Sequence, residues 1–239
     1  MRAALNKLNI DGTVVIGEGE RDEAPMLFIG EKVGAGGPEI DIALDPLEGT
    51  TLTAKANANA MATLALAPSG GFLNAPDVYM EKIAVGGGLP DGIIDINASA
   101  MENLERLAEA KKVNLEDLLV CVLDRPRHQE LISDIRSAGA RIQQISDGDI
   151  YGIIETSQPH SRVDMYLGSG GAPEGVLAAA ALQCIGGQMQ GKLLFRNDDE
   201  RERASKMGID DFDRVYGIND LASGDVIFSA TGVTDGGLR

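Results

Sequence analysis

The sequence predicts an α/β fold that forms a single domain with two α/β lobes, residues 1–100 and 101–239. Its 239 residues, of which 44% are hydrophobic, suffice for a substantial core. The first half contains short apolar runs separated by glycines, a pattern typical of strands and turns. The second half alternates strand and helix patterns, and this order favours parallel strand pairs joined by right-handed crossovers.

The first half is therefore expected to form a sheet. Its strand candidates are 13–17, 40–44, 62–67, 81–87 and 92–96. Residues 1–9 resemble the last turns of a helix without an N-cap, and residues 225–239 resemble a strand followed by an unfinished loop. We accordingly expect a fold truncated at both ends.

The second half begins with a helix, because Ser99 and Glu102 form the S-x-x-E pattern of a capping box. Strands are expected next at 118–123, 141–145, 163–168 and 225–232. Helices are expected at 126–139, 174–187 and 198–208. Gly139 stands where a helix commonly ends in a left-handed residue.

The composition disfavours several classes of partner. With 21 basic and 37 acidic residues, the formal charge of −16 repels nucleic acid and anionic membranes, so neither is expected as a partner. Cys121 and Cys184 lie among apolar neighbours and form no C-x-x-C pair, as is typical of core thiols in a reducing cytoplasm. We expect a cytoplasmic protein.

The stretch "DPLEGTT" carries the first chemical signal. A residue before proline avoids the helical region, so Asp45 is expected to be extended at the end of its strand, with Glu48 one turn further on. Both carboxylates could then meet where open α/β sheets bind ligands. If Thr50 opens a helix, the N–H groups of Gly49 and Thr50 favour a phosphate oxygen. An ordinary acidic turn explains the same residues.

A second acidic loop, 17–25, follows another strand. Glu18, Glu20 and Asp22 would point to one side of an extended segment and repel one another unless water or a cation screens them. Mg²⁺ and Mn²⁺ prefer such oxygen ligands, and two loops at neighbouring strand ends can supply them. Alone the loop is consistent with a solvated bend, but together with "DPLEGTT" it indicates a metal site.

Glu174 repeats the order strand, glycine turn, acid, helix in "GSGGAPEG". The helix dipole alone can explain a carboxylate at that position. A dinucleotide-binding fingerprint does not fit, because Pro173 replaces its last glycine.

Arg125 and Arg127 flank a helix that is expected to begin at Pro126, where positive charge opposes the helix dipole. A bound anion would offset that cost, so the pair is a candidate site for a second phosphate. His128 is more typical of a capping or packed histidine than of a catalyst.

Four further residues carry weaker signals. Asp147, Asp149 and Tyr79 could bind sugar hydroxyls, and Lys82 could contact phosphate. Turn chemistry explains "SDGD" equally well, and Tyr79 could belong to the core.

Seven stretches occur in order along essentially the whole chain: "VVIGEGERDEAPMLFIGEKVG", "DPLEGTT", "NAPDVYMEKIAVG", "LDRPRH", "SDGD", "GSGGAPEGV" and "IFSATGVTDG". Together they resemble the class II fructose-1,6-bisphosphatases of bacteria. The resemblance implies the layered α-β-α-β-α sandwich of the lithium-sensitive, metal-dependent sugar phosphatases. It also implies hydrolysis of the 1-phosphate of fructose 1,6-bisphosphate in gluconeogenesis, and in some photosynthetic members of sedoheptulose 1,7-bisphosphate.

The resemblance further implies roles for individual residues. Thr50 would polarise the attacking water, with assistance from Asp22. Mn²⁺ or Mg²⁺ would be held by Glu18, Asp45, Glu48 and Glu174. The sugar bisphosphate would be bound by Glu48, Gly49, Thr50, Tyr79, Arg125, Pro126, Arg127, Asp147, Gly148, Asp149 and Gly171. We also expect a homo-oligomer.

The chain departs from the family at both ends, since it lacks the upstream helical segment with a metal-binding aspartate and the C-terminal strands. Two alternatives therefore remain open. One is a related sugar or inositol phosphatase, and the other is a catalytically inactive protein that binds sugar phosphates.

Overall fold

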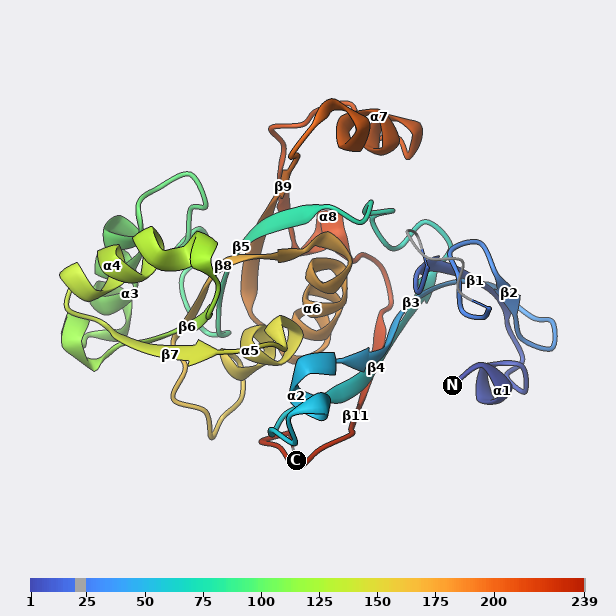
Figure 1. Ribbon diagram of the computed structural model, residues 1–239, viewed down its shortest axis with the longest axis horizontal. Helices are drawn as coiled ribbons and strands as arrows, with labels where there is room; N and C mark the ends of the chain where they lie inside the picture. Colours follow the sequence, from blue (N-terminus) through green and yellow to red (C-terminus); the bar gives the residue numbers. More distant parts are fainter. Residues whose placement is uncertain (20–24, 239) are drawn as a thin grey trace.

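The computed structural model describes residues 1–19 and 25–238, and it shows a layered α/β sandwich built on two mixed sheets (Figure 1). The first sheet has the strand order β11-β4-β3-β1-β2. These strands are β1 (Asp11–Ile16), β2 (Lys32–Val33), β3 (Glu39–Glu48), β4 (Met61–Pro68) and β11 (Ile227–Gly232). The second sheet has the order β10-β9-β5-β8-β6-β7. These strands are β5 (Tyr79–Val85), β6 (Leu119–Leu123), β7 (Arg141–Ile145), β8 (Met165–Gly171), β9 (Gln188–Leu194) and β10 (Val215–Gly217).

Helices lie between the two sheets and on their outer faces, which confirms the predicted sandwich (Figure 1). The inner layer consists of α5 (Asp149–Glu155), α6 (Ala172–Ile185) and α8 (Ile218–Leu221). α3 (Ala100–Lys111) and α4 (Gln129–Ser137) cover the outer face of the second sheet. The short α1 (Arg2–Leu5) places Leu5 against the outer face of the first sheet, and α7 (Asp198–Lys206) follows β9.

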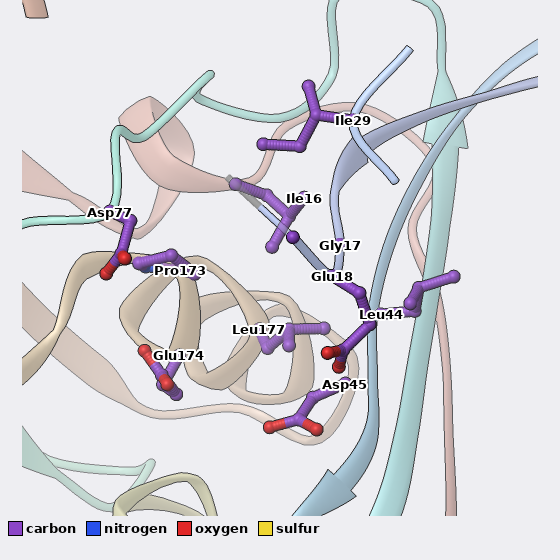
Figure 2. Close-up of a pocket in the computed structure, with 11 residues that line it drawn as sticks. Ile16, Gly17, Glu18, Ile29, Leu44, Asp45, Asp77, Pro173, Glu174 and Leu177 are labelled. Atoms are coloured by element: carbon purple, nitrogen blue, oxygen red, sulfur yellow. The ribbon is translucent and has the colours of Figure 1, made fainter. Parts of the chain in front are cut away.

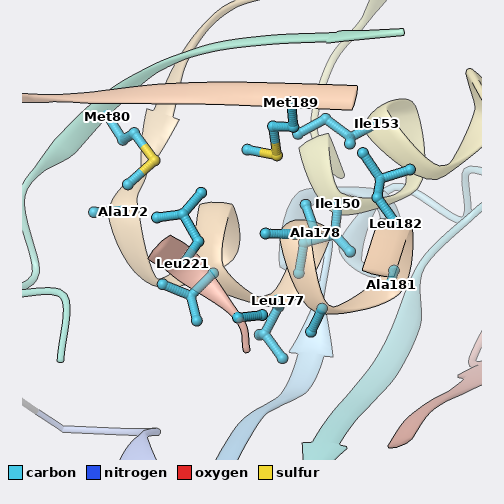
Figure 3. Packing of buried hydrophobic residues seen from close by; sticks show 14 of the residues in the cluster. Met80, Ile150, Ile153, Ala172, Leu177, Ala178, Ala181, Leu182, Met189 and Leu221 are labelled. Atoms are coloured by element: carbon cyan, nitrogen blue, oxygen red, sulfur yellow. The ribbon is translucent and has the colours of Figure 1, made fainter. Parts of the chain in front are cut away.

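The inner layer is apolar on every side because sheets face α6 from two directions. Figure 3 shows the α6 residues Leu177, Ala178 and Leu182 in one apolar cluster with Met80 of β5 and Met189 of β9. Helices that are apolar all round are buried, and the alanines of α6 are almost completely inaccessible. Small side chains let both sheets approach the helix, so α6 holds together the two halves of the molecule.

Most sequence-predicted elements are confirmed, with a few differences. Residues 92–96 form turns and loop rather than a strand, and the helix expected over 126–139 starts with a 3₁₀ turn, Pro126–His128, before α4. Gly139 is left-handed, with φ of 91°. The parallel pair β6 and β7 is present as expected. Among the described residues, six segments were not expected: the strands β2, β9 and β10, the helices α5 and α8, and the 3₁₀ turn Leu115–Asp117.

The sheets do not divide the chain near residue 100. β5 belongs to the second sheet, and β11 returns to pair with β4 in the first. Each sheet therefore draws strands from both expected lobes, because hydrogen bonding between strands is independent of their separation in sequence. The single-domain, two-lobe description stays a prediction.

Replacing Ser99 by alanine should destabilise the protein by about 1 kcal/mol, because the residue caps α3. Its Oγ accepts a hydrogen bond from the N–H of Glu102 (3.2 Å), and Glu102 Oε2 accepts one from the N–H of Ser99 (2.9 Å). Urea unfolding monitored by circular dichroism measures the change. Ser205→Ala, at an exposed position of α7, is the control, and equal stability of the two variants would contradict the capping role.

Candidate active site

A β-bulge in β3 brings Asp45 and Glu48 to the same side of the first sheet. Asp45 pairs with Thr63 and Glu48 with Met61, so two residues of β3 face a single residue of β4. Side chains three apart in a regular strand point to opposite faces, and the extra residue reverses the second of them. Pro46, which has no N–H, is tolerated at such an irregularity.

The sequence expectation for this stretch needs one correction. The strand does not end at Asp45 with Glu48 one turn further on; β3 continues to Glu48. A local hydrogen bond typical of a turn is nevertheless present, because the N–H of Leu47 donates to Asp45 Oδ1 at 2.9 Å. Backbone pairing with β4 continues on both sides of Pro46, and the bulge accommodates the proline within the strand.

Asp45, Glu48 and Glu174 form a carboxylate cluster, with one oxygen of each within 4.8 Å of the other two. Asp45 and Glu48 come from the first sheet, whereas Glu174 lies in the first turn of α6, after β8 of the second. Glu174 Oε2 is buried and has no hydrogen-bond partner among the described residues. A Cβ at Gly171 would overlap that oxygen, so the glycine makes room for the carboxylate.

Glu18 lies across a cavity of about 250 Å³ from Glu174, and Asp45 also lines this cavity (Figure 2). Glu18 follows β1, is exposed, and is outside the three-residue cluster. Asp77, which the sequence analysis did not single out, lines the same cavity; its only signal was its position two residues before β5. The predicted catalytic residue Asp22 lies outside the described residues.

The pKa values of the clustered acids are raised. Burial raises the pKa of Glu48 well above its usual value, and the charges of Asp149 and Glu174 raise it further. Burial, followed by the Asp149 charge, raises the pKa of Glu174 to about 7. Burial is also the main reason that the pKa values of Asp45 and Glu18 are raised. The site therefore concentrates more negative charge than it stabilises by itself, and an oxygen-preferring divalent cation fits it.

Two glycines in left-handed conformations open the two short helices beside the cluster. Gly49 precedes α2 (Thr50–Ala54) with φ of 83°, and Gly148 precedes α5 with φ of 87°. This conformation strains residues that carry a Cβ. The prediction that Thr50 opens a helix is confirmed, and the "SDGD" stretch also turns directly into a helix.

The acid that precedes each of these helices accepts a hydrogen bond from the other helix. Glu48 Oε1 accepts from the N–H of Ile150 in α5 at 3.2 Å. Asp147 Oδ2 accepts from the N–H of Thr51 in α2 at 3.1 Å. These crossed bonds satisfy N–H groups that a helix start leaves unpaired, and they fix the two loops relative to each other.

The two predicted phosphate-binding arginines are held by different partners. Arg125 Nη2 lies 3.3 Å from Asp147 Oδ1, and this contact links Arg125 to the two loops that are joined by the crossed hydrogen bonds. Arg127 donates from Nε to Ser169 Oγ at 2.9 Å, and its guanidinium lies 4.7 Å from the ring centre of Tyr79. Arg196, which the sequence analysis missed, also faces that ring at 5.4 Å. The ring of Tyr79 thus lies next to two guanidinium groups.

His128 is packed, as its sequence context indicated. Its Nδ1 lies 2.7 Å from the carbonyl oxygen of Leu123, and its Nε2 accepts from the N–H of Ser169 at 2.8 Å. Burial lowers the pKa of His128, which favours the neutral ring that these bonds require. The histidine therefore positions Ser169, and Ser169 in turn positions Arg127.

Asp149 is buried at the start of α5, and the side chain of Lys82 in β5 contacts it. Lys82 Nζ lies 2.5 Å from Asp149 Oδ2, and the lysine is completely inaccessible. The ammonium group of Lys82, for which the sequence analysis suggested a phosphate contact, is hydrogen-bonded to this carboxylate.

The chain was compared with known proteins. The sequence model of the family "Bacterial fructose-1,6-bisphosphatase, glpX-encoded" matches residues 1–238. "Fructose-1,6-bisphosphatase 1 class 2" of Escherichia coli K12 is 49% identical over 253 aligned residues, which cover 100% of this chain and 75% of that protein. "Fructose-1,6-bisphosphatase class 2" of Shigella flexneri has the same identity and coverage.

In the part of the chain that the structure describes, no helix is long and apolar enough to cross a membrane. The family match extends through all the stretches that build the cluster, the crossed loops and the arginine positions. On this match and on the identity to its relatives, the chain belongs to the bacterial class 2 fructose-1,6-bisphosphatase family.

Proposed function

We propose that this chain hydrolyses the 1-phosphate of fructose 1,6-bisphosphate to yield fructose 6-phosphate, in a reaction that requires a divalent cation. The observation that carries the proposal is the convergence of Asp45, Glu48 and Glu174 within 4.8 Å, with Glu174 Oε2 enclosed and unpartnered. The choice of fructose 1,6-bisphosphate as the substrate is supported by membership of the fructose-1,6-bisphosphatase family.

Mn²⁺ or Mg²⁺ would be held by the three clustered carboxylates, with Glu18 as a further ligand across the cavity. Both ions prefer carboxylate oxygens. When bound, the cation supplies Lewis-acid charge next to the transferring phosphoryl group. Phosphate monoesters hydrolyse very slowly in water, so such charge neutralisation is the main requirement for catalysis.

Thr50 would orient the attacking water, because it stands at the start of α2, two residues after Glu48. The N–H groups of Gly49 and Thr50, at the start of α2, would take up charge on the phosphoryl oxygens. Asp22 is proposed as the residue that assists this step.

The other end of the substrate would be held by residues of the second sheet and its loops. We propose that Arg127 and Tyr79 bind the second phosphate, with Arg125 beside the crossed loops. Sugar hydroxyls would be bound by the 147–149 loop and the backbone at Gly171. Binding energy from this remote phosphate would position the reacting one.

Two alternatives of different class are distinguished by two measurements. A related sugar or inositol phosphatase would release phosphate faster from inositol or other sugar phosphates in a panel of esters. An inactive binding protein would bind sugar phosphate in a metal-dependent manner in calorimetry without releasing phosphate.

Homo-oligomerisation and a cytoplasmic location are further proposals, as is the absence of nucleic-acid and membrane partners. The net charge of −16 supports the last of these. Light scattering of the purified chain measures its oligomeric state directly.

Glu48→Gln should reduce phosphate release from fructose 1,6-bisphosphate at least about 100-fold, because it removes a charged metal ligand from the cluster. The assay measures inorganic phosphate with Mn²⁺, with Mg²⁺ and with EDTA, and wild-type activity should disappear in EDTA. Glu39→Gln, on an exposed residue of the same strand, is the control and should retain wild-type activity. Full metal-dependent activity of Glu48→Gln would refute the assignment.

Arg127→Met should raise KM for fructose 1,6-bisphosphate about 10- to 100-fold, as expected when a charge-assisted hydrogen bond to phosphate is lost. Initial rates over a range of substrate concentrations separate KM from kcat. Arg201→Met, on the exposed face of α7, serves as control. An unchanged KM would place the second phosphate elsewhere.

The stability of the metal-free protein should fall as pH rises from about 4.5 to about 7. The raised pKa of Glu174 means that the folded state binds more protons than the unfolded state in this window, so stability is highest at the acidic end. Thermal unfolding in EDTA should show a Tm lower by at least about 3 °C at pH 8 than at pH 5.5 from this effect.

Adding Mn²⁺ should raise Tm more at pH 8 than at pH 5.5, because protons compete with the cation for the carboxylates. Glu48→Gln is the control that should lose most of the Mn²⁺ effect. A Mn²⁺ effect of equal size at both pH values would contradict binding at this cluster.

A further inference from the structure

Lys82 occupies a position in β5 that the sheet pattern reserves for an apolar residue. Met80 and Ala84, two residues away on either side, belong to the core around α6, so Lys82 shares their face. Its side chain is completely buried, and it is the only lysine or arginine with a buried side chain in the described part of the chain. A buried ammonium group is strongly unfavourable unless it is paired.

Its hydrogen-bonded partner among the described residues is Asp149, whose Oδ2 lies 2.5 Å from Lys82 Nζ, and the charge of Lys82 also acts to lower the pKa of Glu174. A neighbouring glycine leaves space for this ion pair. A Cβ at Gly170 would overlap Asp149 Oδ2 and lie 3.1 Å from Lys82 Nζ. Gly170 therefore gives space to the ion pair, as Gly171 does for Glu174.

Asp149 is electrostatically close to the carboxylate cluster. Its charge is the largest charge effect on both Glu48 and Glu174, and the neighbouring N–H of Ile150 is bonded to Glu48. Asp149 is nevertheless absent from the cluster whose oxygens lie within 4.8 Å of one another. A fourth carboxylate so near a divalent cation would be drawn to it unless another cation held it in place.

We propose that Lys82 is a positioning residue that holds Asp149 by its Oδ2, keeps it out of the metal ligand set, and reserves its other oxygen for a substrate hydroxyl. The inference rests on the proposed function, because it assumes a metal at the cluster and a sugar phosphate beside it. Lys82 thus separates a carboxylate that binds the substrate from the carboxylates that bind the cation.

Lys82→Met tests this, since methionine retains much of the length of the side chain and loses its charge. Isothermal titration with Mn²⁺ alone should show about tenfold tighter binding, and KM for fructose 1,6-bisphosphate should rise about tenfold or more. Relaxation of water protons by bound Mn²⁺ should report one inner-sphere water fewer than in the wild type, because Asp149 replaces it.

The double variant Lys82→Met/Asp149→Asn should return the number of inner-sphere waters to the wild-type value. Loss of positive charge alone would tighten Mn²⁺ binding without changing that number, so an unchanged water number in Lys82→Met overturns the proposal. Lys192→Met, at the partly exposed position of β9 opposite Glu81, is the control and should change neither quantity.

If Lys82→Met does not fold, Gly170→Ala separates the same pair while keeping both charges, and it should lower the number of inner-sphere waters and raise KM in the same directions. Unchanged values in a folded Gly170→Ala protein would overturn the proposal. Failure of the proposed function is distinguishable, because the wild type itself would then bind no Mn²⁺ or release no phosphate.

Discussion

Mutual repulsion among buried carboxylates is the constraint on which this structure depends. Asp45, Glu48, Asp149 and Glu174 approach one another where the two sheets meet, and burial amplifies their repulsion. Three features oppose it: the ammonium group of Lys82, the N–H group of Ile150 at the start of α5, and the space for a divalent cation. The protein thus stabilises part of the negative charge and leaves the rest for a ligand.

The backbone around the site is shaped by the same constraint. Glycines occupy positions where a Cβ would overlap a functional carboxylate, as at Gly170 and Gly171, or where a helix starts from a left-handed residue, as at Gly49. Elsewhere the sandwich is held by ordinary apolar packing around α6. The alanines of that helix let two sheets come close enough for acids from both to share one cavity.

The proposed site has two chemically different ends, as expected for the proposed bisphosphate substrate. One end is acidic and fits a cation; the other contains Arg127 against Tyr79, with Arg196 facing the same ring. The second end is held by a chain of neutral contacts, from the carbonyl of Leu123 through His128 to Ser169. Because burial lowers the pKa of His128 and favours its neutral form, this support depends little on charge near neutral pH.

The sequence by itself determined the elements whose signals are local. Strand and helix patterns, the Ser99 capping box, the helix start at Thr50 and the candidate acids all follow from residues a few positions apart. Only the tertiary structure decided the bulge that turns Glu48, the return of β11 to the first sheet and the pairing of Lys82 with Asp149, 67 residues away. No short-range pattern encodes such contacts, because strand pairing and the burial of charge are settled when distant segments pack together.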